Sequence, residues 1–210
     1  MATKQFAVSG FDEVELRGVG QIILEQSGTE SLVAEGRDEA LAKIEAVVAA
    51  GRLKLGFEHN WFEFWKVAEY RDTKFRVGVK NIRAVILSGS GDITSGKLAG
   101  DALRIDLNGS GNVTVAVETK RFETRLAGSG DIRASGVADL QRIEIDGSGN
   151  VTARELNGKS AEVTIRGSGN VEVAASDSLS ISIMGNGNVR YTGNPKLDQR
   201  VFGSGRIERV

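Results

Sequence analysis

Apolar and polar residues alternate along most of residues 89–210, and this alternation predicts short strands with one buried face. Apolar residues stand at every second position in stretches such as 103–107 and 113–117. A period of two residues is typical of a half-buried β-strand. Such stretches are separated by Gly-x-Gly, which lets the chain change direction where side chains would clash. Each unit is therefore predicted to be two strands joined by a glycine corner.

The glycine corner recurs seven times at nearly equal spacing. Its first copy is Gly-Ser-Gly-Asp-Ile at 89–93, and the first glycines of the seven copies stand at 89, 109, 128, 147, 167, 185 and 203. A weaker copy, Gly-Val-Gly-Gln-Ile, stands at 18–22. Self-similarity at a fixed period is the signature of a stacked repeat protein. The predicted structural corners are Gly89, Gly91, Gly109, Gly111, Gly128, Gly130, Gly147, Gly149, Gly167, Gly169, Gly185, Gly187, Gly203 and Gly205.

Two arrangements fit this repeat. In a parallel β-helix each repeat forms one coil, and equivalent strands stack about 4.8 Å apart. In an antiparallel meander or barrel the same strands would be joined by hairpins. We favour an all-β fold built as a parallel β-helix, or β-solenoid, with about 19 residues per coil. Nearly identical corners suit stacking on one another, whereas successive turns of a meander face opposite ends.

The residue that follows the second glycine supports stacking of the corners. It is Asn or Asp in six of the seven copies. Stacked amide side chains can form a ladder along a solenoid, whereas two adjacent carboxylates would repel each other. Asp92 and Asp131 alternate with Asn112 and Asn150, which is the order such a ladder needs.

Residues 1–88 carry few of the glycines but also read as β-rich. Alternating apolar residues predict strands near 6–8, 14–16, 22–24, 32–34, 53–55 and 75–79. The stretch 38–50 is predicted to be the one short helix, with Asp38 as N-cap and Gly51 as its stop. We expect an N-terminal β-rich part with the helix and an aromatic insertion (1–88), continuous with a Gly-Ser-Gly repeat solenoid (89–210).

Seven of the twelve aromatic residues of the chain lie between positions 57 and 75. Two interpretations remain open for this insertion. It either folds over one sheet and closes the core, or it exposes an aromatic surface to a partner chain or a glycan, because exposed apolar patches mark contact sites. The candidate contact residues are Trp61, Phe62, Phe64, Trp65 and Tyr70.

Composition excludes several classes of protein. The chain has 27 glycines, one proline, 40% hydrophobic residues and a net charge of −1, which excludes collagen and argues against a disordered linker. The basic and acidic residues number 27 and 28 without a basic tail, so nucleic acid is not expected as a partner. No apolar run is long enough to form a transmembrane segment.

Metals and cofactors are not expected either. The absence of cysteine excludes thiolate sites, and the single histidine, His59, excludes a zinc site made of several histidines. The corners lack the lysine of a phosphate-binding loop. Most of them carry neutral Asn where calcium would require carboxylates.

Catalysis would require paired carboxylates, as in the carbohydrate-active enzymes built on β-helices. Asp106, Glu144 and Asp146 could form such a cluster on neighbouring coils, although we favour a solvated strand face as the explanation for them. The residue type before the corner differs from copy to copy, from a serine at Ser88 to a phenylalanine at Phe202. Such variation is typical of an unconstrained exposed position.

Several motifs together resemble the head GIN domain family, described as "putative autotransporter adhesin" and as a domain of unknown function. They are Phe-Asp-Glu-Val-Glu-Leu-Arg-Gly-Val-Gly-Gln-Ile at 11–22, the Trp-containing insertion at 61–65, Leu-Ser-Gly-Ser-Gly-Asp-Ile at 87–93, and Tyr-x-Gly-Asn-Pro at 191–195. The resemblance implies a secreted or envelope-associated bacterial β-solenoid protein without established catalytic residues.

We therefore expect a non-enzymatic binding or adhesion module of the bacterial cell envelope or surface. The alternatives are a self-associating structural scaffold and, with less support, a carbohydrate-active β-helix enzyme. The expected partners are a second copy of the chain and a glycan or protein surface ligand. Residues 1–5 lack the apolar stretch of a secretory signal. The expected location is periplasmic, outer-envelope or secreted with the leader absent from this sequence, and the cytoplasm is not excluded.

Overall fold

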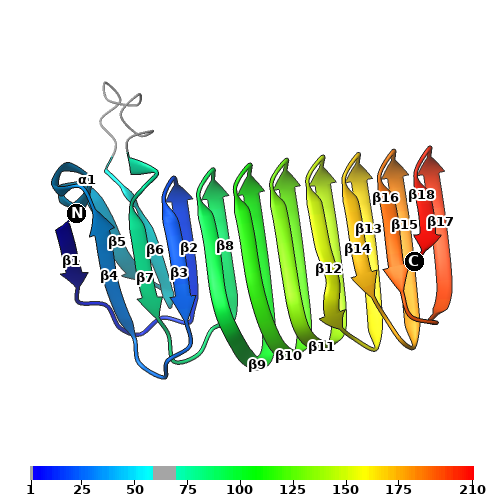
Figure 1. The fold of residues 1–210 in the computed structure, drawn as a ribbon, viewed down its shortest axis with the longest axis horizontal. Coiled ribbons are helices and arrows are strands. Elements are labelled where there is room, and N and C mark those ends of the chain that lie inside the picture. The colour runs from blue at the N-terminus through cyan, green and yellow to red at the C-terminus, as the bar shows by residue number, and fades with distance from the viewer. Residues whose placement is uncertain (1, 59–69) are drawn as a thin grey trace.

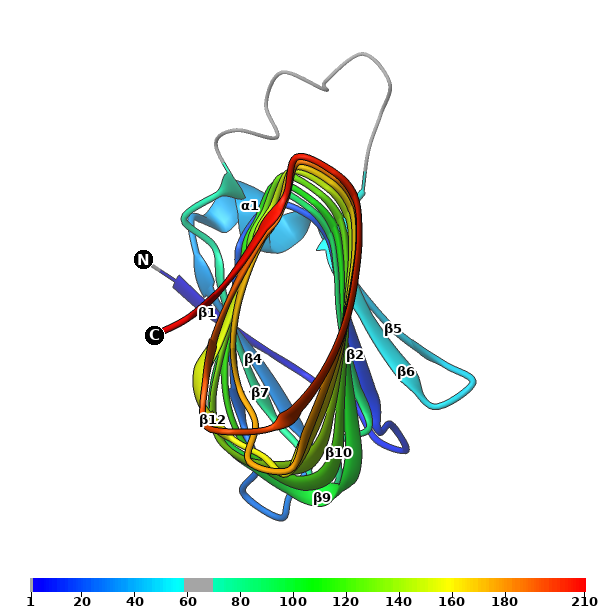
Figure 2. The same ribbon diagram turned by 90° about the vertical axis from the view of Figure 1, so that its right-hand side faces the viewer.

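The computed structural model describes residues 2–58 and 70–210, and these form a β-solenoid with coils of about 19 residues. The coils follow one another along the long axis of the molecule (Figure 1). Viewed along that axis, they superimpose on a flattened oval with two long walls (Figure 2).

The elements fall into an N-terminal group and a repeat group. The N-terminal elements are β1 (Ala2–Phe6), β2 (Glu13–Gly18), β3 (Gln21–Glu25), β4 (Ser31–Gly36), α1 (Asp38–Ala42), β5 (Ile44–Ala49), β6 (Arg52–Phe57) and β7 (Lys74–Gly78). The repeat elements are β8 (Ala84–Gly89), β9 (Asp92–Gly109), β10 (Asn112–Gly128), β11 (Asp131–Gly147), β12 (Asn150–Asn157), β13 (Ser160–Gly167), β14 (Asn170–Ala174), β15 (Ser178–Gly185), β16 (Asn188–Thr192), β17 (Lys196–Gly203) and β18 (Arg206–Arg209).

Neighbouring coils pair in parallel, and each glycine corner lies on the one before it. Between β10 and β11, Asn112 pairs with Asp131 and Gly128 pairs with Gly147, so the register is shifted by one repeat. The parallel β-helix predicted from the repeat is therefore confirmed, and the antiparallel meander is wrong. The inward side chains of the alternating pattern, such as Ile105, Leu126 and Ile145, form one continuous buried core.

The two glycines of a corner have different constraints. The first is in the left-handed region, as at Gly147 with a φ of 143°. The second, Gly149, has an ordinary φ, but a Cβ there would overlap the carbonyl oxygen of Gly130 and the side chain of Leu126. Backbone N–H groups of one corner donate to carbonyls of the preceding one, as from Ser148 to Gly128 at 2.9 Å. A side chain at either glycine would force the stacked corners apart.

The amide ladder predicted at the corners is present. Asn112 Nδ2 donates to Asp92 Oδ1 at 2.8 Å, and Asn150 Nδ2 donates to Asp131 Oδ1 at 2.9 Å. Further along, Asn170 donates to Asn150 and Asn188 donates to Asn170. Every amide donates toward the N-terminal end of the solenoid. An ionised Asp131 has no proton to donate to Asn112, so the ladder runs in two segments.

The N-terminal strands do not stack in chain order. β2 lies in parallel between β6 and β8, and β3 lies between β7 and β9. The coil made by β2 and β3 therefore lies between two neighbours along the axis. The first repeat coil is on one side of it, and the coil made by β6 and β7 is on the other. The aromatic insertion joins β6 to β7, at the place in the chain where the other coils have Gly-x-Gly.

Antiparallel strands and the helix close this end of the solenoid. β4 pairs with β7 and β1 with β4 on one wall, while β5 pairs with β6 on the other. The helix α1 connects β4 to β5 and thus crosses between the two walls (Figure 2). Its Ala40 and Leu41 are buried in the common core.

The predicted extent of the helix is wrong. Only Asp38–Ala42 is helical, its N-cap is Arg37 without a side-chain hydrogen bond, and the rest of the predicted segment is β5. The β-branched residues of β5 pair with β6, as Val48 does with Leu53. Gly51 does not stop a helix but completes a tight hairpin turn, in which Ala50 and Gly51 have φ of 51° and 77°. Strand pairing has outweighed the local helical pattern.

Within the described residues, no helix has the length and apolar character needed to cross a membrane.

Candidate functional site

Most of the aromatic residues proposed as contacts lie outside the described residues, namely Trp61, Phe62, Phe64 and Trp65. Tyr70 is described and is buried. Its ring packs against that of Phe57 with their centroids 4.8 Å apart, and Phe57 in turn packs against Phe75. Tyr70 is therefore part of the N-terminal core in this structure.

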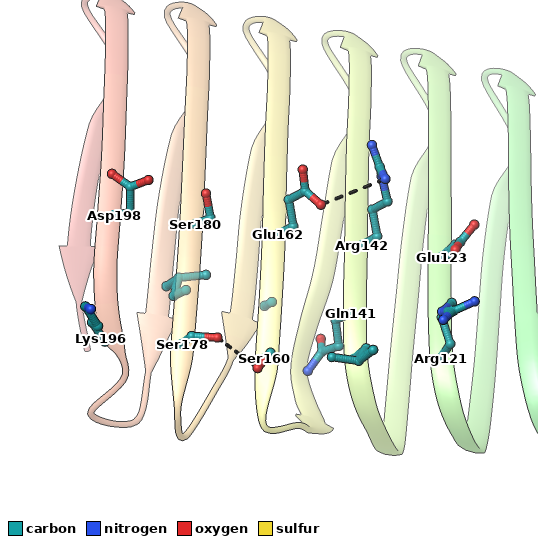
Figure 3. Close-up of a pocket in the computed structure, with 13 residues that line it drawn as sticks. Arg121, Glu123, Gln141, Arg142, Ser160, Glu162, Ser178, Ser180, Lys196 and Asp198 are labelled. Atoms are coloured by element: carbon teal, nitrogen blue, oxygen red, sulfur yellow. Dashed lines mark hydrogen bonds and ion pairs between the residues drawn. The ribbon is translucent and has the colours of Figure 1, made fainter.

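A groove of about 700 Å³ crosses the outer face of one wall, over the second halves of β10 and β11 and the first halves of β13, β15 and β17 (Figure 3). The parallel register brings one or two outward side chains from each of these strands into it. Lining side chains on neighbouring strands are therefore about 4.8 Å apart along the axis, which is the distance between the strands. The labelled polar residues that line it are Arg121, Glu123, Gln141, Arg142, Ser160, Glu162, Ser178, Ser180, Lys196 and Asp198.

Charges alternate along the groove from one coil to the next. Register places Glu123 next to Arg142 and Arg142 next to Glu162. The Arg142 guanidinium lies 2.9 Å from Glu144 and 3.9 Å from Glu162. The hydrogen bond with Glu144, together with attraction from Glu162, raises the pKa of Arg142 above its ordinary value. Three basic and three acidic side chains line the groove, so its formal charge is zero.

Hydroxyl groups and apolar surface occupy the middle of the groove. Ser178 Oγ donates to Ser160 Oγ at 2.8 Å, and Ser180 lies on the same strand as Ser178. Leu140 is 46% exposed beside them, although it stands on a wall whose outward residues are otherwise mostly polar. Exposed leucine beside hydroxyls and paired charges can contact the apolar face of a ligand while polar groups bind its edges.

Gln141 forms part of the groove's base and links the two walls. Its side chain is buried in the inward column between Phe122 and Ala161. The amide Nε2 donates to the carbonyl oxygens of Leu156 at 3.1 Å and Ala174 at 2.9 Å. β9, β10 and β11 each continue as one strand around the bend opposite the glycine corners. In the later coils the strand is interrupted there, because β12 ends at Asn157 and β14 at Ala174. Gln141 thus satisfies carbonyl groups at the place where the coils become discontinuous.

A second groove, of about 580 Å³, crosses the opposite wall over the starts of β11, β12, β14, β16 and β18. It is lined by the corner amides and by charged pairs such as Arg190 with Glu172 at 3.8 Å. Asn150, Asn170 and Asn188 already bond to one another along this wall. The ladder thus already uses one N–H of each of these amides, which a ligand in the second groove could otherwise accept.

The carboxylates considered for catalysis do not all lie on neighbouring coils, and each has an arginine partner. Asp106 and Glu144 lie two coils apart with Arg125 between them in register, so the expectation that they sit on neighbouring coils is wrong. Asp106 is 2.9 Å from Arg104, and Asp146 is 3.1 Å from Arg166. Among the described residues, no group of three or more His, Cys, Asp or Glu side chains is arranged to hold a metal ion.

Sequence reasoning missed the groove, because its residues lie one or more repeats apart in the chain and become neighbours only in the parallel register. One signal was available. Once the repeats are aligned on their glycines, Arg104, Glu123, Arg142 and Glu162 fall in one column with alternating charge.

Comparisons with known proteins agree with this fold. The family model described as "Putative auto-transporter adhesin, head GIN domain" matches residues 10–195. A solved structure titled a putative adhesin, from Bacteroides fragilis, is 25% identical, with 100% of this chain and 96% of that one covered at a TM-score of 0.92. A Parabacteroides distasonis structure with the same description is 24% identical. It covers 100% of this chain and 96% of its own, with a TM-score of 0.84.

A third solved structure, also from Parabacteroides distasonis, is titled a putative lipid binding protein. It is 23% identical, with 100% of this chain and 96% of that one covered at a TM-score of 0.78. Likeness at this level of identity shows a shared fold and nothing about ligands. No curated protein sequence matches the chain.

Proposed function

The chain belongs to the head GIN domain family, described as putative auto-transporter adhesins, as its motifs predicted, and we propose that it is a non-enzymatic binding module of the adhesion type. The proposed ligand is a neutral glycan bound along the groove that crosses β10 to β17. We further propose that the protein acts in the cell envelope or outside the cell, which is where an adhesin meets its ligand.

The observation that carries this proposal is the combination of exposed hydroxyls and compensated charge in the groove. Basic and acidic side chains are equal in number along the groove, so no net charge favours a polyanion or a polycation. Forked guanidinium groups, carboxylates and serine hydroxyls are donors and acceptors for the hydroxyl groups of a sugar. The groove is open and runs along five coils, which suits an extended chain better than a compact small molecule.

Retention of the protein on a panel of immobilised neutral and charged polysaccharides tests the proposal. We expect retention on at least one neutral polysaccharide. Arg142→Ala should weaken that binding about tenfold or more, because it removes a guanidinium donor that lies between the acidic side chains of the groove. Arg190→Ala is the matched control, since it removes an arginine paired to two acidic residues on the opposite wall. Equal loss in both variants, or binding to none of the neutral polysaccharides, would contradict the groove assignment.

The aromatic insertion remains a second proposed contact and is separable from the groove. Trp65→Ala should reduce ligand binding without loss of stability if the segment is a contact, and reduce stability if it belongs to the core. Measuring thermal unfolding and polysaccharide retention on this one variant distinguishes the two. If Trp65→Ala reduces polysaccharide binding and Arg142→Ala leaves it unchanged, the binding site is the insertion and not the groove.

A further inference from the structure

The last coil of the solenoid leaves a long strand edge without a partner strand. β17 pairs with β15 and β18 pairs with β16, and within the described residues neither has a strand on its other side. Leu197 and Val201 point inward like buried Leu179 and Ile183 one coil earlier, yet they are 36% and 38% exposed. Phe202 beside them is 68% exposed. An edge of this kind is a template for pairing with another chain.

The outward charges of β17 are also without partners. Lys196, Asp198 and Arg200 are in register with Ser178, Ser180 and Ser182 of the preceding coil. Across residues 2–58 and 70–210 none of these three charged side chains takes part in an ion pair. Earlier coils behave differently, because their outward arginines face carboxylates of the next coil, as Arg142 faces Glu162. Charge in this molecule therefore helps coils to stack, and the last coil has unused charge on its free side.

We propose that this edge is the docking site for a second copy of the chain, with the β17 strands of the two copies pairing antiparallel about a two-fold axis at Gln199. In an antiparallel pair, inward residues stay opposite inward residues only if the axis passes through a residue position. The central choices are Asp198, Gln199 and Arg200. An axis at Asp198 or at Arg200 sets that charged residue opposite its own copy.

Only the register centred on Gln199 makes the edge self-complementary. It sets Asp198 opposite Arg200 of the partner subunit, and two-fold symmetry repeats that ion pair. It also sets Leu197 opposite Val201 of the partner subunit, and Lys196 opposite the ring of the partner subunit's Phe202, a cation–π arrangement. The same axis stacks the two end coils face to face and encloses Leu197, Val201 and Ile207.

Gln199 itself is informative because it stands in an inward column that is otherwise mostly apolar. Its counterparts one and two coils earlier are Ile181 and Val163, both buried. On the axis, the amide of Gln199 meets the amide of Gln199 of the partner subunit, and each can donate to the other. A single buried polar pair of this kind fixes the register of an association.

Closure into a dimer follows from this self-complementarity. A β17 edge that paired with β1 or β5 at the other end of the next molecule would make a heterologous contact and an open filament. The opposite charges at positions 198 and 200 favour the two-fold contact, which uses up the edge and stops growth.

Sedimentation velocity of the whole chain over a wide concentration range tests the dimer. Wild type should convert from monomer to dimer without larger species. Arg200→Asp and Asp198→Arg should each raise the dissociation constant about a hundredfold or more, because each sets like charges opposite one another twice. An equimolar mixture of these two variants should recover a heterodimer, since every charge then meets its opposite. Arg154→Asp, which makes the same charge change on a middle coil, should dimerise like wild type.

A thiol at the axis gives an independent test, because the chain has no cysteine. Gln199→Cys should form a disulfide-linked dimer under mild oxidation, since residues that face one another on the axis are within disulfide reach. Ser204→Cys, at the corner of the same coil, should not, because the axis carries the two corners to opposite ends of the interface. A wild type that stays monomeric, growing filaments, no heterodimer in the mixture, or no cross-link at position 199 would each overturn the proposal.

Discussion

The two ends of this solenoid are built differently. At the N-terminal end, antiparallel strands and α1 cover the first coils, and Leu16, Leu32 and Leu53 have no solvent exposure. At the C-terminal end, the corresponding inward positions of β17 are partly open to solvent. In a stacked-coil protein each coil is stabilised by its two neighbours, so a coil with one neighbour is less stable unless something covers it.

The difference also extends to charge. On β2, the side chains of Glu13 and Glu15 are buried beneath Arg17, Arg52 and Arg83, with ion-pair distances of 2.6 to 3.4 Å. On β17, the charged side chains face solvent and the serines of β15. One end therefore completes its interactions within the chain, while the other retains the groups that a partner would need. The comparison predicts that the same substitution lowers the free energy of unfolding by different amounts at different positions along the axis.

A valine at the second glycine of a corner is the most severe such substitution. Gly149→Val should prevent cooperative folding or lower the free energy of unfolding by more than about 4 kcal/mol, because the side chain would overlap Gly130 and Leu126 between two fixed coils. Gly205→Val meets an equivalent overlap with Gly187. Its coil can move away at the open end, so about 1–2 kcal/mol is expected. Chemical denaturation measures both.

Equal losses at the two glycines would show that the last coil is held as firmly as the middle ones. Gly149→Ala provides a milder version in case the valine variant yields no folded protein. It should still be less stable than Gly205→Ala.

The repeat explains why so much of the solenoid could be predicted from sequence. Gly-x-Gly at constant spacing specifies both the corner and the parallel register, so positions such as Asn112 and Asp131 become neighbours without further information. The N-terminal end lacks that constraint. Nothing local in 38–50 shows that Val47 and Val48 will pair with β6 instead of continuing a helix.

The order of the first coils was beyond sequence reasoning for a related reason, and the aligned repeats indicate only one charged column of the groove. The insertion of β2 between β6 and β8 depends on pairings between segments far apart in the chain, such as Glu13 with Arg52 and with Ala84. The groove depends on which outward side chains share a column, and on the absence of a large residue at Ser160 and Ser178. Both are properties of the assembled walls, while the local pattern determines only which residues face inward.

A leucine truncation compares the two ends directly. Leu16→Ala, in the covered first coil, should lower the free energy of unfolding by about 2–5 kcal/mol, since it leaves a cavity in a fully buried site. Leu197→Ala removes a side chain that is already partly hydrated, so its cost should be below about 1 kcal/mol. The measurement is equilibrium denaturation at a protein concentration low enough to keep the chain monomeric. A large loss for Leu197→Ala under those conditions would mean that the end is covered within the monomer.

Acid should weaken the N-terminal end in particular. Burial by itself raises the pKa of Glu15, but hydrogen bonds and attraction from Arg17 and Arg52 outweigh it and leave the pKa below 4.5. The pKa values of Glu30 and Glu35 are also lowered, chiefly by a backbone hydrogen bond from Gly10 and by a side-chain hydrogen bond from Arg76. A carboxyl group with a depressed pKa in the folded state contributes stability above its unfolded pKa. That contribution is lost as the pH falls through the folded value.

A smaller expected effect than the truncation of Leu16 is a dependence of stability on pH that can be traced to one side chain. Between about pH 5 and pH 3, wild type should lose about 1 kcal/mol more than Glu15→Gln, because the variant has no carboxyl group to titrate at position 15. Asp101→Asn is the control on an exposed pair. The pKa of Asp101 is also lowered, by its hydrogen bond with Lys120, but both side chains are largely in water, so high salt should remove their effect. If the free energy of unfolding depends on pH in the same way for wild type and Glu15→Gln, the buried cluster does not stabilise the N-terminal end. The contrast between the two ends would then rest on apolar covering alone.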